Sequence, residues 1–170
     1  LLKTANLTPI RANEARDWLV KYQYVNIERI LVNKTGKKSL FLDLTEKSYM
    51  ALQTNKPYSG KVSFTHRIYA NLVATKLRAD DWNVTIEAIT TKPGSQHKMD
   101  ILAMRHGENL DYEITISTAN VEDNIINGFQ DNRITKVIIV ADRKALQECK
   151  TKTAHLMVEY EGRIEFKPIS

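Results

Sequence analysis

The clearest alternation of apolar and polar residues lies between Lys98 and Val140. Residues 98–104 predict a strand, residues 106–109 a turn, and residues 110–117 a second strand with strict alternation. One face of this second strand carries Asp111, Glu113, Thr115 and Ser117, and the other carries Tyr112, Ile114 and Ile116. Residues 121–130 then show helical spacing. The apolar run 136–140, which begins with a lysine, is typical of a buried strand.

The same patterns divide the rest of the chain into elements. Thr8 and Pro9 are suited to begin a helix over 10–22, and two strands, 24–32 and 39–44, flank a basic Gly-containing tip at 33–38. A short helix over 46–53 precedes the turn-rich segment 54–60, where we expect a domain boundary. The later segments are predicted as a helix over 64–79, a strand over 82–90, a helix over 143–152, and strands over 155–160 and 163–166.

Composition and charge narrow the function classes. The 170 residues are enough for one substantial domain or two small ones, and no apolar run is long enough to span a bilayer. A lone cysteine, Cys149, excludes an internal disulfide framework and indicates a cytoplasmic protein. Residues 1–60 carry ten Lys or Arg against five Asp or Glu, whereas residues 61–170 carry fifteen of each. A basic first part beside a neutral second part favours a nucleic-acid partner at the N-terminal part.

Three carboxylates on the predicted strands are candidate metal ligands. Asp100 and Glu113 lie on neighbouring strands, so the two acids could flank a divalent cation, and Glu87 could supply a third ligand. Each acid also has a simpler interpretation. Asp100 could accept backbone N–H groups at a strand edge, and Glu113 and Glu87 could be solvated side chains.

The acid on one strand, followed by Glu113-Ile114-Thr115 on the next and then a helix and a strand, resembles the PD-(D/E)xK nuclease superfamily. The resemblance covers roughly residues 64–140 and implies Mg²⁺ or Mn²⁺ held by Asp100 and Glu113, with hydrolysis of phosphodiesters. Thr115 stands at the position of the family's lysine. Lys98 or Gln130 could replace that lysine as a catalytic residue. The helix over 64–79 lacks the acid that the family often has there, and His66 near its start could contact phosphate or metal.

The N-terminal helix, the basic-tipped hairpin and the segment after it resemble the second half of a winged-helix domain. That resemblance implies double-stranded DNA as the partner, with the helix in the major groove and the hairpin on the backbone. The residues expected to contact DNA are Arg11, Asn13 and Arg16 on the helix and Lys34, Lys37 and Lys38 on the hairpin. The alternative is a winged helix that binds protein or packs against a neighbour. Residues 1–5, which open on two leucines, look like the end of a helix, so we expect a truncated module of a longer parent protein.

These observations lead to one fold expectation and two functional hypotheses. We expect an α+β chain with an α/β core: residues 1–56 form a winged-helix-like module, and residues 57–170 form a restriction-endonuclease-like α-β-β-β-α-β domain. The first hypothesis is a DNA-binding, metal-dependent nuclease, such as a domain of a mobile-element protein, working as a homodimer or within a larger parent. The second is a catalytically inactive nuclease fold that binds DNA or protein. A small-molecule enzyme is disfavoured because the sequence has neither a glycine-rich phosphate loop nor a nucleophile elbow.

Overall fold

The computed structural model describes residues 8–31, 38–54, 62–90 and 98–169. Within these residues the chain forms six α-helices, one short 3₁₀ helix and seven strands in two sheets, so the expected mixed α/β composition is confirmed. Two compact units separate between Phe64 and Thr65. The boundary predicted between residues 56 and 57 lies outside the described residues. No helix within the described ranges is long and apolar enough to cross a membrane.

The first unit is a helix, a hairpin and a short helix. Helix α1 spans Pro9–Lys21, and the side chain of Thr8 accepts a hydrogen bond from the Arg11 backbone N–H at 3.4 Å, as its position before Pro9 predicts. Strands β1 (Val25–Leu31) and β2 (Lys38–Leu44) pair antiparallel, and α2 spans Glu46–Ala51. Of the hairpin tip predicted at 33–38, residues 33–37 lie outside the described residues and Lys38 begins β2; the predicted helix end at residues 1–5 also lies outside them.

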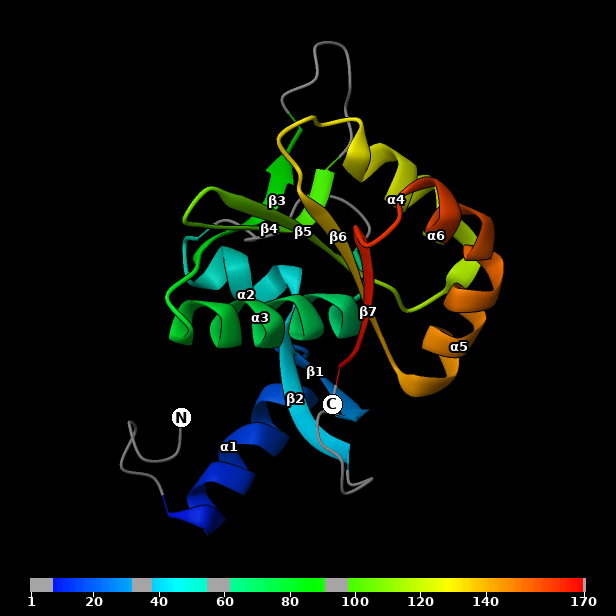
Figure 1. Cartoon of the computed structure of the whole chain (residues 1–170). Coiled ribbons are helices and arrows are strands. Elements are labelled where there is room, and N and C mark those ends of the chain that lie inside the picture. The colour runs from blue at the N-terminus through cyan, green and yellow to red at the C-terminus, as the bar shows by residue number, and fades with distance from the viewer. Residues whose placement is uncertain (1–7, 32–37, 55–61, 91–97, 170) are drawn as a thin grey trace. The chain divides into compact units, whose positions relative to one another are not determined.

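The second unit is a five-stranded sheet between two layers of helices. Helix α3 (Phe64–Ala79) lies on one face, and α4 (Val121–Phe129), α5 (Arg143–Lys152) and α6 (Ala154–Glu159) lie on the other (Figure 1). The strands run in the order β3-β4-β5-β6-β7, and their bounds are β3 Asn83–Ile89, β4 Lys98–Arg105, β5 Glu108–Ile114, β6 Lys136–Ala141 and β7 Ile164–Pro168. The first three strands are antiparallel, whereas β5–β6 and β6–β7 are parallel.

Each face of the sheet has its own apolar core. On the α3 side, Leu110, Tyr112 and Ile114 of β5 pack with Ala70 and other small residues of the helix. On the opposite side, a second cluster joins the sheet to α4, α5 and α6, with members such as Val137, Ile139, Ile125, Cys149 and Leu156. Because β5 is central and covered on both sides, its polar face is buried as well.

Two sequence predictions fail in this unit. The predicted strand over 155–160 is wrong, because residues 155–159 lie in helix α6 and Tyr160 is its C-cap. Leu156 is buried and Val158 is exposed, although these two residues would share one face of a strand. The short apolar run 156–158 does not distinguish a strand from a helix. The second error is the end of β5, which stops at Ile114 rather than Ser117, since the 3₁₀ helix η1 begins at Thr118.

Candidate functional site

Polar residues gather where β5 ends, beside the parallel pair β5–β6. Ligands of open α/β sheets commonly bind at the carboxyl ends of parallel strands. The antiparallel registers bring the end of β3 and the start of β4 to the same place, with Ile89 opposite Lys98 and Ile101 opposite Tyr112. The structure therefore places Glu87, Lys98, Asp100 and Glu113 at one end of the sheet.

The regular strand pairing is interrupted at two of these acids. Strand β3 pairs Ile86 with Ile101 and Ala88 with Met99, yet Glu87 and Asp100 between them are not paired, and Glu87 has a left-handed φ of 53°. Both strands change face here: residues 86 and 101 pack on the α3 side, and residues 88 and 99 pack on the other. Regular alternation would keep residues 84, 86 and 88 on one face, but the positive φ at Glu87 reverses the alternation beyond residue 86.

The Asp100 carboxylate takes the place of a backbone acceptor between β4 and β5. Its Oδ2 accepts the Ile114 N–H at 2.7 Å and lies 2.9 Å from Nε2 of His66, which α3 supplies. The register of β4 and β5 would place Asp100 opposite Glu113, but no Cα pairing is present there. The prediction that Asp100 accepts a backbone N–H group is thus correct. The same carboxylate also lies beside His66, so its bond to the backbone does not remove it from the acid cluster.

Glu113 and Asp111 share the buried face of β5. Asp111 is 0% exposed and Glu113 is 2% exposed, so the solvated interpretation of Glu113 is wrong. Burial raises the pKa of Asp111 to about 8, a hydrogen bond with Glu113 lowers it in part, and the charges of Asp100 and Asp131 raise it. Burial also raises the pKa of Glu113 well above its ordinary value, followed by the charges of Asp111 and Asp100.

A buried carboxyl pair of this kind requires a proton or a cation. Apart from the bond with Glu113, neither side-chain oxygen of Asp111 has a hydrogen-bond partner among the described residues. Asp111 and Glu113 can hydrogen-bond to each other only through a proton that one of them carries. A bare pair of negative charges in this position would be strongly destabilising. Either a shared proton or a bound cation therefore balances the charge.

Gly128 of α4 lets the helix approach these acids closely. A Cβ at this position would collide with the Asp111 carboxyl group and would lie 2.9 Å from Cγ2 of Val137. A glycine in the middle of a helix ordinarily weakens the helix, so its place here follows from the close packing of α4 on β5. The burial of Asp111 depends on this contact.

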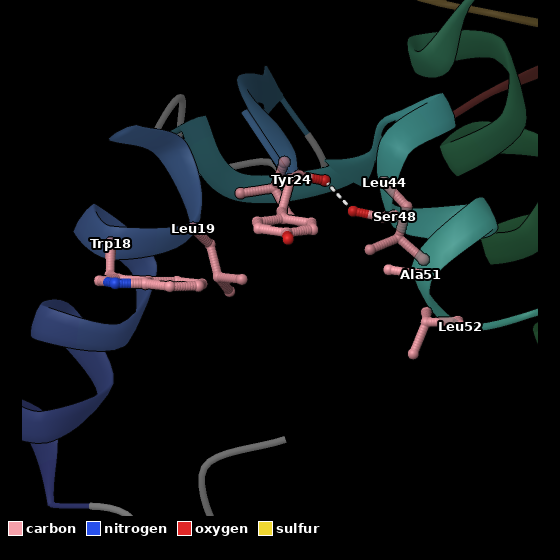
Figure 2. Close-up of a pocket in the computed structure, with 8 residues that line it drawn as sticks. Trp18, Leu19, Tyr24, Leu44, Ser48, Ala51 and Leu52 are labelled. Carbon is pink, nitrogen blue, oxygen red and sulfur yellow. Dashed lines mark hydrogen bonds between the residues drawn. The ribbon is translucent and has the colours of Figure 1, made fainter. Parts of the chain in front are cut away.

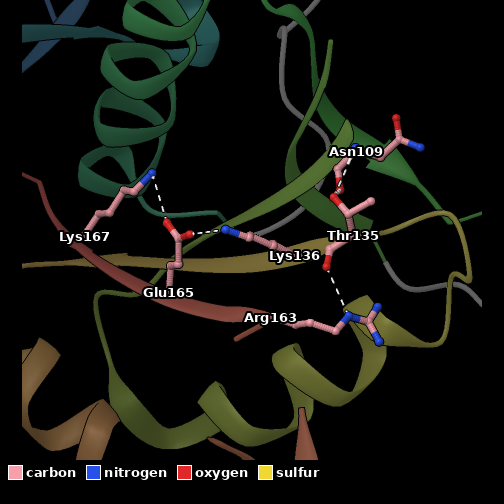
Figure 3. A network of polar contacts seen from close by, with 6 residues as sticks. All are labelled: Asn109, Thr135, Lys136, Arg163, Glu165 and Lys167. Carbon is pink, nitrogen blue, oxygen red and sulfur yellow. Dashed lines mark hydrogen bonds and ion pairs between the residues drawn. The ribbon is translucent and has the colours of Figure 1, made fainter. Parts of the chain in front are cut away.

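Glu165 on the edge strand β7 shows how neighbouring lysines neutralise a carboxylate in this sheet. Glu165 of β7 accepts from Lys136 Nζ at 2.6 Å and lies 3.4 Å from Lys167 Nζ (Figure 3). The hydrogen bond from Lys136 holds the pKa of Glu165 below its usual value, the direction opposite to that of Asp111. In the same network Thr135 bonds the Asn109 carbonyl and accepts from Arg163 through its own carbonyl.

The other site residues predicted in this unit surround the buried pair Asp111 and Glu113 to different extents. Lys98 Nζ lies 3.8 Å from Glu87 Oε2, so these two form an ion pair beside Asp100. Gln130 is exposed at the C-terminal cap of α4. Thr115 is 5% exposed, and its hydroxyl has no hydrogen-bond partner among the described residues. Asp111, which the alternation placed on the polar face but did not identify as a site residue, joins Glu113.

In the first unit the predicted DNA-contacting residues are partly engaged with each other. Arg16 donates from Nε to Asp17 at 2.8 Å and from Nη1 to the Asn13 side chain at 3.1 Å. Arg11 is exposed on α1, and Lys38 is exposed at the start of β2. Lys34 and Lys37 lie outside the described residues. A DNA contact by Arg16 would therefore compete with its ion pair, whereas Arg11 and Lys38 face solvent.

An apolar pocket of about 300 Å³ lies within the first unit (Figure 2). Its wall is formed by α1, the hairpin and α2, and the residues that line it are Trp18, Leu19, Tyr24, Val25, Leu44, Ser48, Ala51 and Leu52. Trp18 is 52% exposed and stacks on Tyr24 with a 5.7 Å separation of ring centroids. The Ser48 hydroxyl is occupied by a bond to the Tyr24 carbonyl. The pocket offers apolar and aromatic contacts and no reactive group.

The donor set at the acid cluster agrees with a hard cation. Among the described residues there is no group of three His, Cys, Asp or Glu side chains arranged to hold a metal. Mg²⁺, however, is commonly bound by one or two carboxylates, with waters and substrate phosphates as the other ligands. Asp100 and Glu113 could supply those two carboxylates, and Asp111 lies next to them.

Comparisons with known proteins give the chain no family. No family model and no curated protein matches it. Among solved structures, the crystal structure of a protein of unknown function, AF1548, matches with a TM-score of 0.39 and 16% identity, over 59% of this chain and 58% of that one. That similarity is too weak to assign a fold, so the function must be argued from the residues of the site.

Proposed function

We propose that the second unit hydrolyses phosphodiester bonds in DNA with the help of a divalent cation held by Asp100 and Glu113. The observation that carries the proposal is the interrupted pairing of β4 and β5, where the carboxylates of two adjacent strands lie close enough for the charge of Asp100 to raise the pKa of Glu113. The order α3-β3-β4-β5-α4-β6 supports the resemblance to the PD-(D/E)xK superfamily, because that superfamily carries its acids on the same two strands.

The surrounding residues would position the carboxylates of Asp100 and Glu113 for binding a cation. The Ile114 N–H and His66 both bond Oδ2 of Asp100, which fixes the plane of its carboxylate. Burial and neighbouring acids make the charged form of Glu113 costly until positive charge arrives. A bound Mg²⁺ or Mn²⁺ would lower the pKa of a bound water and stabilise charge on the phosphate. The sheet and α4 exclude bulk solvent from Glu113 and Asp111 and so strengthen the electrostatic interactions there.

The first unit would hold duplex DNA in this proposal. It contains the whole excess of positive charge, and Arg11 and Lys38 are exposed on its helix and hairpin. Contacts of Lys or Arg with phosphates release counterions, so binding should weaken steeply with salt. Charge reversal at Arg11 and Lys38 should lower the affinity for duplex, and reversal at Arg16 should do so less, because Asp17 already neutralises it.

A second candidate function is a nuclease-like fold that binds DNA without cleaving it. Thr115 favours this reading, because a neutral hydroxyl cannot supply the charge that a lysine gives to the scissile phosphate. In that case the acid pair would hold a proton and serve structure, and the basic first unit would carry the function.

A cleavage assay separates the two candidates. Plasmid and single-stranded DNA would be incubated with Mn²⁺ and the wild-type protein, Asp100→Asn, Glu113→Gln, or the control Asp123→Asn. Asp123 is an exposed acid in the first turn of α4 and keeps the net charge matched. Hydrolysis requires cleavage by the wild type and the control, with loss in both site variants. Intact DNA in every reaction, together with salt-dependent duplex binding, would favour the non-cleaving module and refute hydrolysis.

A further inference from the structure

Two buried hydroxyl groups of the second unit lack hydrogen-bond partners among the described residues, those of Thr90 and Thr115. Burying a hydroxyl without a partner costs free energy, typically ~1–3 kcal/mol. Buried polar groups without partners are rare in native proteins, and each one calls for an explanation. Thr115 differs from Thr90 in its position, because it directly follows the strand that carries Asp111 and Glu113.

Thr115 is held rigidly beside Glu113. Its backbone N–H donates to the Val140 carbonyl at 2.8 Å, so the pairing of β5 with β6 continues one residue beyond Ile114. Alternation along the strand places its side chain on the same face as Glu113 and Asp111. The side chain is 5% exposed, and a β-branched residue in a strand has restricted rotation about χ1. The hydroxyl is thus a fixed donor next to the carboxylates.

We propose that the Thr115 hydroxyl donates a hydrogen bond to a phosphodiester oxygen of nucleic acid bound at the acid cluster. This inference rests on the proposed function and adds a substrate-binding residue to it. A phosphate oxygen is the acceptor that the hydroxyl lacks, and it would lie beside Glu113 if a cation joined the two. Because the hydroxyl is uncharged, this bond would position the phosphate, and the cation would neutralise the negative charge of the phosphate.

The test compares three threonine variants in both stability and binding. Thr115→Val removes the hydroxyl and keeps the shape, and Thr115→Ser keeps the hydroxyl. Thr90→Val is the matched control, since Thr90 is equally buried and its hydroxyl also lacks a partner, but it follows β3 on the far side of β4. Thermal unfolding is recorded without metal. Binding of a short fluorescein-labelled duplex, and of the matching single strand, is measured with Ca²⁺ by anisotropy.

We expect both valine variants to unfold at a temperature equal to or above that of the wild type, because each loses an unsatisfied buried hydroxyl. Thr115→Val should bind the labelled DNA about tenfold more weakly, whereas Thr115→Ser and Thr90→Val should bind like the wild type. Wild-type affinity in Thr115→Val would overturn the inference and leave the proposed function standing. A fall in the unfolding temperature of Thr115→Val alone would assign the hydroxyl a structural bond and also overturn it. Absence of binding by the wild type would refute the proposed function itself.

Discussion

The substitution Asp111→Asn tests whether the buried carboxyl pair requires a proton. In the folded protein the pKa of Asp111 is raised from 3.8 to about 8, with burial as the main cause. Folding then takes up a proton wherever the pH lies between these two values. The stability associated with Asp111 is fully present below the unfolded pKa, and it is lost as the pH rises toward about 8. An asparagine is uncharged at every pH and keeps the shape.

The size of the effect follows from the pKa change. One pKa unit corresponds to ~1.4 kcal/mol, so a change from 3.8 to about 8 is worth ~6 kcal/mol at most. The slope attributable to Asp111 is therefore up to ~1.4 kcal/mol per pH unit. The amide of Asp111→Asn can also donate to Glu113 whether or not that acid is charged. We expect the variant to approach or exceed wild-type stability as the pH rises, with a difference of several kcal/mol in its favour near the upper end.

Urea unfolding provides the assay, with EDTA present so that no divalent cation neutralises the acids. The free energy of unfolding is measured across the pH range from about 4 to about 9 for the wild type, Asp111→Asn and the exposed control Asp123→Asn. The wild type and control should lose stability in parallel, and Asp111→Asn should lose less. Identical slopes in all three proteins would show that Asp111 titrates normally and would refute the account of the pair.

Three further substitutions probe the packing and charges around the site. Gly128→Ala should destabilise the protein by ~1–3 kcal/mol in urea unfolding, because its Cβ would collide with the Asp111 carboxyl, and adding Asp111→Ala should recover part of that loss. Lys136→Gln should raise the pKa of Glu165 toward its ordinary value in an NMR titration, and an unchanged titration would contradict the ion pair. The contribution of this carboxylate to stability is present above its unfolded pKa and is lost as the pH falls through its folded pKa. Asp142→Ala should cost ~1 kcal/mol in urea unfolding by removing the N-cap of α5, and no change would show that the cap is replaced.

The elements whose local signals agree with their surroundings could be predicted from the sequence. Helix α1 begins at its Thr8-Pro9 signal. Helices α3 and α5 have the predicted bounds, because apolar positions at helical spacing face a core in each of them. Residues 155–160 were mispredicted because a short apolar run carries no information about its neighbours. The helix α6 follows from Leu156 entering the core beside α5.

Only part of the site could be predicted from the sequence, because the rest depends on tertiary contacts. Alternation along β5 was enough to place Asp111 and Glu113 on one face, but their burial depends on α4 packing closely through Gly128, a tertiary contact. The positive φ at Glu87, and with it the change of face at Asp100, has no local signal in the sequence. The position of His66 near the start of α3 follows from the sequence, whereas its bond to Asp100 depends on how the helix packs on the sheet.

Divalent-cation binding tests the central claim most directly. Mn²⁺ would be titrated by calorimetry into the wild type, Asp100→Asn, Glu113→Gln and the control Asp123→Asn at neutral pH. We expect the wild type and the control to bind Mn²⁺ with release of protons, because the cation replaces the proton held by the buried pair Asp111 and Glu113. Both site variants should lose that binding. Equal heats in all four proteins, or none in the wild type, would contradict a metal site at Asp100 and Glu113.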